Sequence, residues 1–256
     1  MKILVCVKQV PDQTRPVCVN DTRVDLPEVL SWKMNRFDEF AVEAAIQIKE
    51  SIPGTTVDSV TIGPERTQTV VRRSLGMGAD NGWIIHVSPH EGLTPRIIAQ
   101  IICHELGNNH YDLILTGFMS EDNMNAQTGQ MIAAQLNVPS VSGVIQLTVN
   151  GDQQAITVVR EMGGGMREEL LVQLPAVLCV QSGINQPRYP RLSAMLKAAS
   201  RPLRCIESST DGIFCQDQMI SQIQLPKNIR DAHFLEGSVQ EQANALSTLL
   251  KEKGFL

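Results

Sequence analysis

Short, nearly continuous apolar runs alternate with amphipathic stretches over about the first 140 positions. The apolar runs span residues 3–7, 57–62, 83–87 and 113–116. Runs without polar alternation are typical of strands buried on both faces of a parallel sheet. The stretches between them space apolar residues three and four apart, as in helices with one buried face. They span residues 37–49, 67–77, 96–106 and 126–136. The pattern predicts an α/β fold, in which helices on both faces cover a parallel sheet.

Beyond position 139 the pattern changes to shorter strand-like segments. They cover residues 142–149, 154–160, 168–174 and 176–181. Asn150-Gly151 is a strong hairpin signal, and Gly163-Gly164-Gly165 marks a second turn. We therefore expect an antiparallel extension of the sheet.

From residue 185 onward the chain has too few apolar residues for a core of its own. Residues 185–204 carry Pro and Arg, and residues 208–222 are polar and resemble a loop. A final helix is predicted at about 239–251, where Ser238 and Glu241 form a capping box. The pattern predicts a main domain over residues 1–184 and an arm over residues 185–256. The arm must lie across the main domain or against another chain.

Composition and charge exclude several classes of protein. A net charge of −5 argues against electrostatic binding of nucleic acid. There is no run of 18 apolar residues, so we expect no membrane span. The apolar run at the N-terminus is too short for a signal peptide, which favours a cytoplasmic or matrix location. Six cysteines without a CxxC pair favour buried free thiols over disulfides, and no metal site is expected.

A long polar loop follows the fourth predicted strand. It begins at Gly117 and leads directly into the helix after Thr128. Backbone N–H groups at that helix start, with the side chains of Gln127 and Thr128, can bind a phosphate. Asp122 can accept a hydrogen bond from a ribose hydroxyl. The alternative is that Asp122 or Asn125 simply caps the helix.

Other candidate binding segments lie at the ends of neighbouring strands. Cys6 closes the first strand, Ile62 closes the second, and residues 35–38 precede the first helix. Ligands of open α/β sheets bind outside the carboxyl ends of the strands, so these segments favour a nucleotide pocket. For Asn35 alone, capping of the helix is the simpler explanation.

The usual catalytic motifs are missing from the sequence. It has no GxxxxGK[ST], GxGxxG or GxSxG motif. No Ser/His/Asp or Cys/His arrangement is evident either. A nucleotide pocket without acid–base residues is more typical of a carrier or regulatory subunit than of an enzyme.

Residues 159–170 read VREMGGGMREEL, and residues 174–179 read LPAVLC. Together they resemble the signature of the electron transfer flavoprotein (ETF) beta-subunit family, although Gly163 stands where the family usually has an acidic residue. Further similar segments occur in family order across nearly the whole chain: residues 2–11, 34–35, 37, 63–64, 76–80, 127–130 and 185–190.

The resemblance implies a heterodimer. An alpha subunit would hold most of the FAD, while this chain would bind AMP structurally in a Rossmann-type domain similar to the adenine nucleotide alpha hydrolases. The corresponding cofactor-binding positions are Cys6, Asn35, Arg36, Phe37, Asp38, Ile62, Gly117, Ser120, Asp122, Asn123, Asn125, Ala126, Gln127 and Thr128. Phe37 matches a position that approaches the partner's flavin. Met124 and Ala126 depart from the family pattern, so a second FAD in place of AMP, with electron bifurcation, is an alternative.

Residues 185–201 resemble the family's recognition loop, in which a leucine docks into an apolar pocket of a partner dehydrogenase. Leu192 holds that position here. The implied docking residues are Arg188, Tyr189, Arg191, Leu192 and Lys197. Basic residues around an apolar anchor would steer the encounter with the partner. The alternative is a helix start with Leu192 in the core. The final helix is expected to pack on the partner subunit.

The resemblance implies an electron carrier without bond chemistry of its own. It would pass electrons from a flavin dehydrogenase to a quinone reductase or another acceptor. One alternative is an ATP-using enzyme of the alpha-hydrolase type, but residues 8–12 (KQVPD) lack the glycines and serine of its phosphate loop. Another alternative is a nucleotide-sensing module without a redox role.

Overall fold

The computed structural model describes residues 1–12, 18–20, 23–25, 31–87, 93–107, 109–208, 223–224 and 234–256. The chain forms two compact units. The first contains residues 1–17 and 26–219, and the second contains residues 18–25 and 220–256. Residues 185–208 belong to the first unit, so the unit boundary differs from the division predicted at residue 184.

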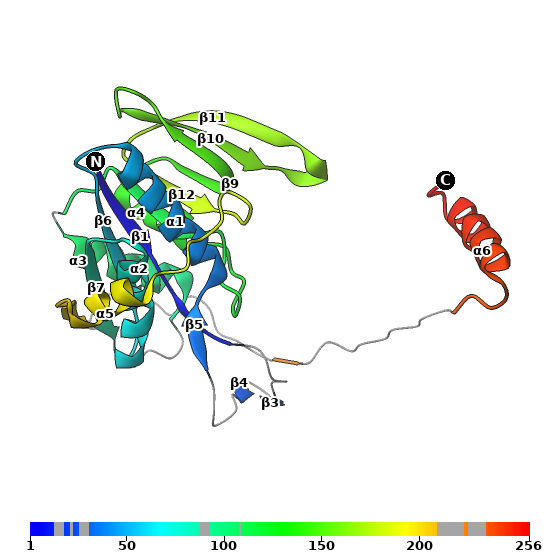
Figure 1. Cartoon of the computed structure of the whole chain (residues 1–256), viewed down its shortest axis with the longest axis horizontal. Helices are drawn as coiled ribbons and strands as arrows, with labels where there is room; N and C mark the ends of the chain where they lie inside the picture. The colour runs from blue at the N-terminus through cyan, green and yellow to red at the C-terminus, as the bar shows by residue number, and fades with distance from the viewer. Residues whose placement is uncertain are drawn as a thin grey trace. The chain divides into compact units, whose positions relative to one another are not determined.

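A nine-stranded sheet runs through the first unit in the order β11-β10-β9-β12-β8-β1-β6-β7-β13 (Figure 1). Its parallel strands are β1 (Lys2–Cys6), β6 (Thr56–Ile62), β7 (Asn81–Val87), β8 (Leu113–Gly117), β9 (Ser140–Val149), β12 (Ala176–Val180) and β13 (Arg204–Ser208). β10 (Ala155–Glu161) and β11 (Arg167–Gln173) add antiparallel to β9. The predicted parallel sheet and its antiparallel extension are confirmed, whereas β13 was not predicted.

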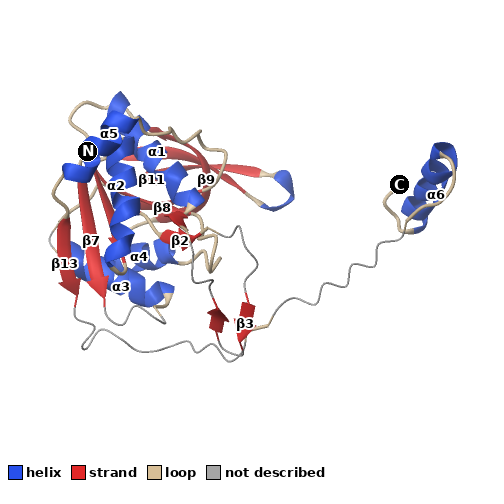
Figure 2. Cartoon of the chain, turned by 60° about the horizontal axis from the view of Figure 1, so that its bottom comes forward, coloured by secondary structure: helices blue, strands red, loops and turns tan. Residues whose placement is uncertain are grey.

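Helices cover both faces of this sheet (Figure 2). α1 (Arg36–Ser51) and α2 (Gln68–Met77) pack on one face, and α3 (Pro95–Leu106) and α4 (Thr128–Leu136) on the other. α5 (Leu192–Ser200) packs on α2. In β1, Ile3 and Val5 join one core cluster while Leu4 joins the other. Side chains alternate across a strand, so a strand covered on both faces needs a continuous apolar run.

Local signals set the starts of two helices. Thr94 Oγ1 accepts a hydrogen bond from Ile97 N, and Pro95 occupies the first turn of α3. A 3-10 turn (Glu65–Thr67) leads into α2.

A small second sheet lies outside the main one. In it, β2 (Gln9–Pro11) pairs antiparallel with β5 (Trp32–Met34).

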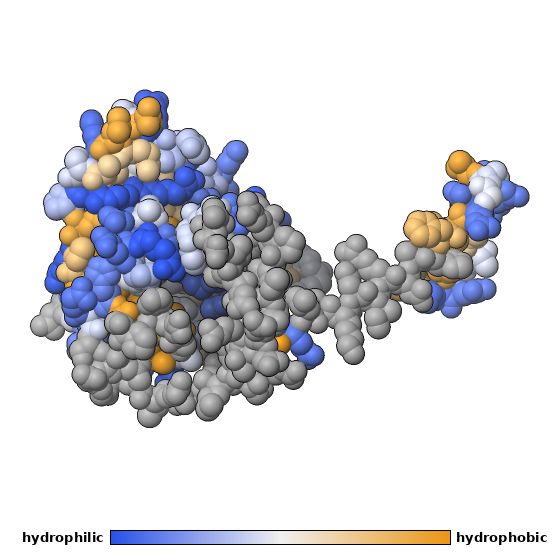
Figure 3. Space-filling model, turned by 90° about the horizontal axis from the view of Figure 1, so that it is seen from below, coloured by the Kyte–Doolittle hydropathy of each residue, from blue (hydrophilic) through white to orange (hydrophobic). Residues whose placement is uncertain are grey.

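The second unit contains an antiparallel pair, β3 (Cys18–Asn20) and β4 (Arg23–Asp25), and the helix α6 (Val239–Glu252). The predicted capping box is confirmed, because Ser238 Oγ accepts from Glu241 N and the Glu241 carboxylate accepts from Ser238 N. No residue of α6 is buried, and Val239 and Leu246 are exposed. Figure 3 shows both hydrophobic and hydrophilic residues on this C-terminal segment.

Four cysteines have side chains that the structure describes, and all four are free thiols. Cys179 is buried, Cys6 and Cys103 are half-buried, and Cys205 is exposed on the edge strand β13. The prediction of free thiols holds for these four, but burial of Cys205 was a wrong prediction. The side chains of Cys18 and Cys215, and most of the polar stretch 208–222, lie outside the described residues.

The described parts of the chain contain neither a membrane-spanning helix nor a metal-binding cluster. None of the helices there has the length and apolarity to cross a bilayer. No three His, Cys, Asp or Glu side chains there come together in a way that would hold a metal ion.

Candidate functional site

The loop between β8 and α4 lies against the start of α1. Asn35, which is 1% exposed, connects the two. Its Nδ2 donates to Met119 O at 2.9 Å, and its Oδ1 accepts from Glu121 N at 3.1 Å. Its backbone N also donates to Lys8 O at 2.9 Å. Three segments that the sequence placed at one sheet edge are therefore in direct contact.

The same contacts bear on the alternative role of Asn35 as a helix cap. Asn35 does occupy the N-cap position of α1, but its side chain makes no capping hydrogen bond. Its side-chain amide instead makes hydrogen bonds to the backbone of the loop. Capping alone therefore does not explain this residue.

Asp38 joins the carboxyl ends of two neighbouring strands. Its Oδ2 accepts from Lys8 N at 2.7 Å, and its Oδ1 accepts from Gly117 N at 3.1 Å. Burial raises the pKa of this carboxyl to about 7, although its hydrogen bonds oppose that shift. Both carboxylate oxygens accept hydrogen bonds from backbone N–H groups. Asp38 therefore positions the ends of the two strands and does not offer a free oxygen to a ligand.

Gly117 has no room for a side chain. A Cβ atom there would lie 2.7 Å from the Cβ of Phe37 and closer still to Oδ1 of Asp38. The aromatic rings of Phe37 and Phe118 lie 6.4 Å apart and are tilted by 58°. Phe37, which the resemblance matches to a position near the flavin, is thus packed against Gly117 and Phe118 of the loop.

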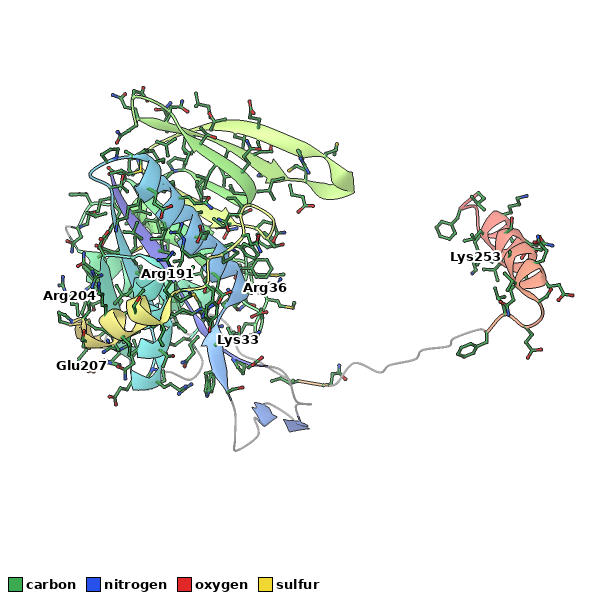
Figure 4. All side chains as sticks on the ribbon, in the orientation of Figure 1. Lys33, Arg36, Arg191, Arg204, Glu207 and Lys253 are labelled. Atoms are coloured by element: carbon green, nitrogen blue, oxygen red, sulfur yellow. The ribbon has the colours of Figure 1, made fainter. Side chains whose placement is uncertain are left out.

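Charged side chains tie the loop to the ends of β1 and β5. Lys8 Nζ lies 2.7 Å from Asp122 Oδ1 and 3.2 Å from Ser120 Oγ. Lys33 Nζ lies 3.4 Å from Glu121 Oε2. Burial opposes the charge on Asp122, yet the hydrogen bond from Lys8 keeps the pKa of this carboxyl below its usual value. Figure 4 labels Lys33 beside the start of α1, where Arg36 projects.

α4 begins without a side-chain cap. Its N-cap residue is Gln127, which makes no capping hydrogen bond, so neither Asp122 nor Asn125 caps the helix. The capping alternative is therefore wrong. Backbone N–H groups at an uncapped helix start are the donors that a phosphate group needs.

The backbone before α4 has an uncommon conformation. Met124 and Ala126 both have φ of 52°, in the left-handed region that costs a non-glycine residue about 1 kcal/mol or more. Gln127 follows with φ of −122° and ψ of −25°. Asn123 and Asn125 are exposed in the same loop.

Two further features fit a bound nucleotide. A Cβ atom on Gly129 would lie 2.8 Å from Thr116 Oγ1 and closer to Cys179 Sγ, so only glycine lets α4 start directly on the strand ends. Gln130 Oε1, in the first turn of α4, is a buried polar atom without a hydrogen-bond partner. Buried polar atoms are rarely left unpaired, which suits a ligand that carries donor groups.

Cys6 and Ile62 contribute an apolar wall. Both pack against the core cluster on the α3 and α4 face of the sheet. Burial raises the pKa of the Cys6 thiol, so it stays protonated and unreactive at neutral pH. These residues can contact a ligand but supply no chemistry.

The second predicted site lies on α5. Leu192 is 76% exposed, which rules out the alternative of a core residue. Tyr189 and Leu196 are also exposed, as are the basic side chains of Arg191 and Lys197. Tyr189 lies with its ring 5.7 Å from the guanidinium of Arg73. The structure therefore places the predicted anchor and two of the predicted basic residues at the surface.

Arg188 differs from the other predicted docking residues. Its guanidinium bonds to the carboxylates of Glu43 and Glu50 on α1. Its charge is thus neutralised within the chain. Sequence reasoning missed Lys33, whose only local signal is a charged residue in the short strand β5.

Comparison with known proteins identifies the family. The electron transfer flavoprotein domain model matches residues 27–210. The chain is 31% identical to the electron transfer flavoprotein subunit beta of Methylophilus methylotrophus, over 98% of both chains. It is 29% identical to the subunit beta of Bacillus subtilis, over 99% of this chain and 98% of that one. It is 34% identical to the subunit beta of Homo sapiens, over 83% of this chain and 84% of that one. The chain therefore belongs to the electron transfer flavoprotein family, as a beta subunit.

Proposed function

We propose that this chain pairs with an alpha subunit and, as part of that heterodimer, relays electrons from a flavin dehydrogenase to a quinone reductase or another acceptor. FAD, held mainly by the alpha subunit, supplies the redox chemistry when bound. The observation that carries the proposal is the cluster of hydrogen-bonded polar groups at the ends of β1 and β8. Asn35, Asp38 and Lys8 there hold the polar loop that leads into the uncapped start of α4.

AMP is the nucleotide that we propose for this arrangement. The backbone N–H groups at Gln127 and Thr128 would hold its phosphate, where the dipole of α4 favours negative charge. The unpaired oxygen of Gln130 would accept from a nucleotide donor group. A ligand that binds only the folded chain stabilises it by mass action, which is a sufficient structural role.

Docking of the dehydrogenase is the role that we propose for α5. Leu192 supplies the apolar anchor, and Arg191 and Lys197 steer the encounter. The apolar side chains of α6, none of them buried, would pack on the alpha subunit. The chain itself would carry out no bond chemistry.

The ligand is tested on the purified heterodimer by denaturing it and identifying the released nucleotides by chromatography. One FAD with one AMP supports the proposal. Two FAD without AMP would mean that the loop holds a second flavin and that the heterodimer bifurcates electrons. FAD alone would refute a nucleotide in this chain.

Two glycine substitutions, one at the candidate site and one control, test where in the chain the AMP binds. Gly129→Ala would press a methyl group onto Thr116 and Cys179, and we expect AMP to be lost while FAD stays. Gly163→Ala adds the same methyl group into open space and should keep both nucleotides. Equal AMP content in the two variants would argue against the start of α4 as the phosphate site.

Docking is tested with Leu192→Ala. Truncation of an anchor residue typically weakens binding by about 2 kcal/mol or more. The kcat/KM for reduction by the dehydrogenase should therefore fall about thirtyfold. Heterodimer assembly and flavin content should not change, because the side chain is exposed. Dissociation of the heterodimer would instead show that Leu192 belongs to the subunit interface.

A further inference from the structure

α5 is too short to hold its exposed side chains in place by itself. It has nine residues, of which only Ala198 is buried. Leu192 and Leu196, one helical turn apart, are 76% and 65% exposed. Isolated helices of this length are marginal in water, so contacts with the rest of the fold must order it.

Arg72 of α2 holds the C-terminal end of α5. Its Nη1 lies 2.8 Å from Ala198 O and 2.7 Å from Ala199 O. Arg201 O lies 3.4 Å from the same nitrogen. The last carbonyls of a helix have no partner within it, and a cation also suits the negative end of the helix dipole. Arg72 therefore serves as the cap that the sequence of α5 lacks.

Arg188 holds the segment that leads into α5. Its Nε lies 2.8 Å from Glu43 Oε2 and its Nη2 lies 2.9 Å from Glu43 Oε1, so the pair is bidentate. Its backbone N donates to the same carboxylate at 3.1 Å. Glu43 is 3% exposed, so little water competes for it. Asn185 adds a hydrogen bond from Nδ2 to Phe40 O at 3.0 Å.

A glycine allows α2 and α5 to touch between these two ties. A Cβ atom on Gly76 would lie 3.4 Å from Pro190 Cβ and would collide with Met195 Sδ. Pro190 is buried beside α2. Figure 2 shows α5 next to α2 on the same side of the sheet. The docking helix is thus fixed at its entry, its middle and its end.

We propose that Arg72 and Arg188 are positioning residues for docking, which hold α5 so that Leu192 and Leu196 are presented before a dehydrogenase arrives. The inference rests on the proposed docking function of Leu192. Both guanidinium groups are engaged within the chain, so they act through the anchor. Ordering a flexible helix costs conformational entropy. Because α5 is ordered when the chain folds, this cost is not incurred when the dehydrogenase binds.

The first test replaces Arg72 in the assembled heterodimer. The electron donor is the flavin dehydrogenase from the same organism that reduces the heterodimer fastest. Arg72→Met should raise the KM for this dehydrogenase about fivefold to tenfold, with kcat unchanged, because ordering α5 then falls on the binding step. Flavin content and reduction by dithionite, which needs no docking, should stay the same.

Arg66→Met is the matched control. Arg66 lies in the 3-10 turn before α2, where its guanidinium stacks on Trp32 at 4.1 Å. The change removes the same charge near the same helix without contact to α5, so KM should change by less than about twofold. Arg72→Lys can still donate to one carbonyl of α5, so its KM should lie between those of the wild type and Arg72→Met. This variant also tests the proposal if Arg72→Met folds poorly.

A double-mutant cycle separates positioning from independent effects. In the Leu192→Ala background, Arg72→Met should add little, because the anchor that it positions is gone. Arg188→Met should behave in the same way. Hydrogen exchange should also show faster exchange of the α5 amides in both arginine variants, with the sheet unchanged.

Each remaining outcome has a definite meaning. If Leu192→Ala impairs electron delivery while both arginine variants behave like Arg66→Met, the positioning proposal is overturned and docking stands. If Arg72→Met costs as much in the Leu192→Ala background as alone, Arg72 acts independently of the anchor and the proposal is overturned. If Leu192→Ala has no effect, the docking function itself fails.

Discussion

α1 holds two regions of the molecule by two different kinds of contact. At its start, the buried side chains of Asn35 and Asp38 bond to backbone groups of the loop between β8 and α4 and to Lys8 N, just after β1. Along its length, the carboxylates of Glu43 and Glu50 bond to the guanidinium of Arg188 before α5. One helix thus positions both the candidate nucleotide site and the candidate docking site.

The difference suits the task proposed for each region. Buried hydrogen bonds to backbone atoms define a single geometry and are little screened by salt. The loop that they hold still contains left-handed Met124 and Ala126, a strain that a bound ligand can offset. The Arg188 ties are partly exposed, so they fix α5 without burying it. A binding site needs shape, whereas a docking helix needs exposure and order together.

The largest expected effect comes from Gly117→Ala. The added methyl group meets Asp38 and Phe37, and overpacking of this kind costs about 1–3 kcal/mol. We expect a lower free energy of unfolding and loss of AMP, while the KM for the dehydrogenase stays the same. Denaturant unfolding and nucleotide analysis check this, with Gly163→Ala as the control in open space. A change in KM as large as the loss of AMP would show that the two regions are not separable.

Glu43→Gln tests the other half of the comparison. It breaks the bidentate pair with Arg188, but Glu50 remains as a partner, so we expect a loss of about 1–2 kcal/mol in the free energy of unfolding. KM for the dehydrogenase should rise and AMP content should not change. Loss of AMP in this variant would contradict separate roles for the two parts of α1.

Asp38 should make the loop region sensitive to pH. Its pKa of about 7 in the folded chain lies above the value of about 3.9 expected when unfolded, so the folded chain binds more protons between these values. Stability should therefore fall as pH rises from 5 to 7, by at most about 1.4 kcal/mol per unit, and the effect should level off above pH 7.

The check is chemical denaturation from pH 5 to 8. Asp38→Asn should remove this part of the pH dependence, because an amide does not titrate. Asp152→Asn, in the exposed turn after β9, is the matched control and should keep the wild-type profile. Parallel profiles for wild type and Asp38→Asn would mean that Asp38 is ionised throughout.

The smallest expected effect comes from Ala126→Gly. Glycine adopts the left-handed conformation without strain, so the free energy of unfolding should rise by about 0.5–1 kcal/mol. If strain in the loop is coupled to the ligand, the variant should also release AMP more slowly. Gln153→Gly, at φ of 56° in a hairpin turn, relieves similar strain elsewhere and should leave AMP release unchanged.

Local patterns predicted much of this fold. The run at residues 3–7 identified β1 because Ile3, Leu4 and Val5 are buried on alternate faces of the sheet. The capping box identified the start of α6, since its hydrogen bonds span only three residues. By contrast, β13 was missed: among the described strands it lies at the edge of the sheet, paired with β7, and its residues are mostly polar. An edge strand does not need an apolar run.

Within the candidate sites, two of the predicted residues make their bonds to other parts of the same chain. Asp38 was expected to contact the ligand, yet both of its oxygens bond to backbone N–H groups. Arg188 was expected to meet the partner, yet its carboxylate partners lie about 140 residues earlier in the chain. Arg72 gave no sequence signal, because the carbonyls that it caps lie 126 and 127 residues away.

The sequence by itself determined the alternation of strands and helices, the sheet extension and the membership of the family. These depend on periodicity and on short motifs, which act over a few residues. Only the tertiary structure decided which polar side chains bind their own chain and which remain available to a ligand or partner. Hydrogen bonds and ion pairs form between whatever groups the fold brings within about 3 Å, and local sequence does not encode that proximity.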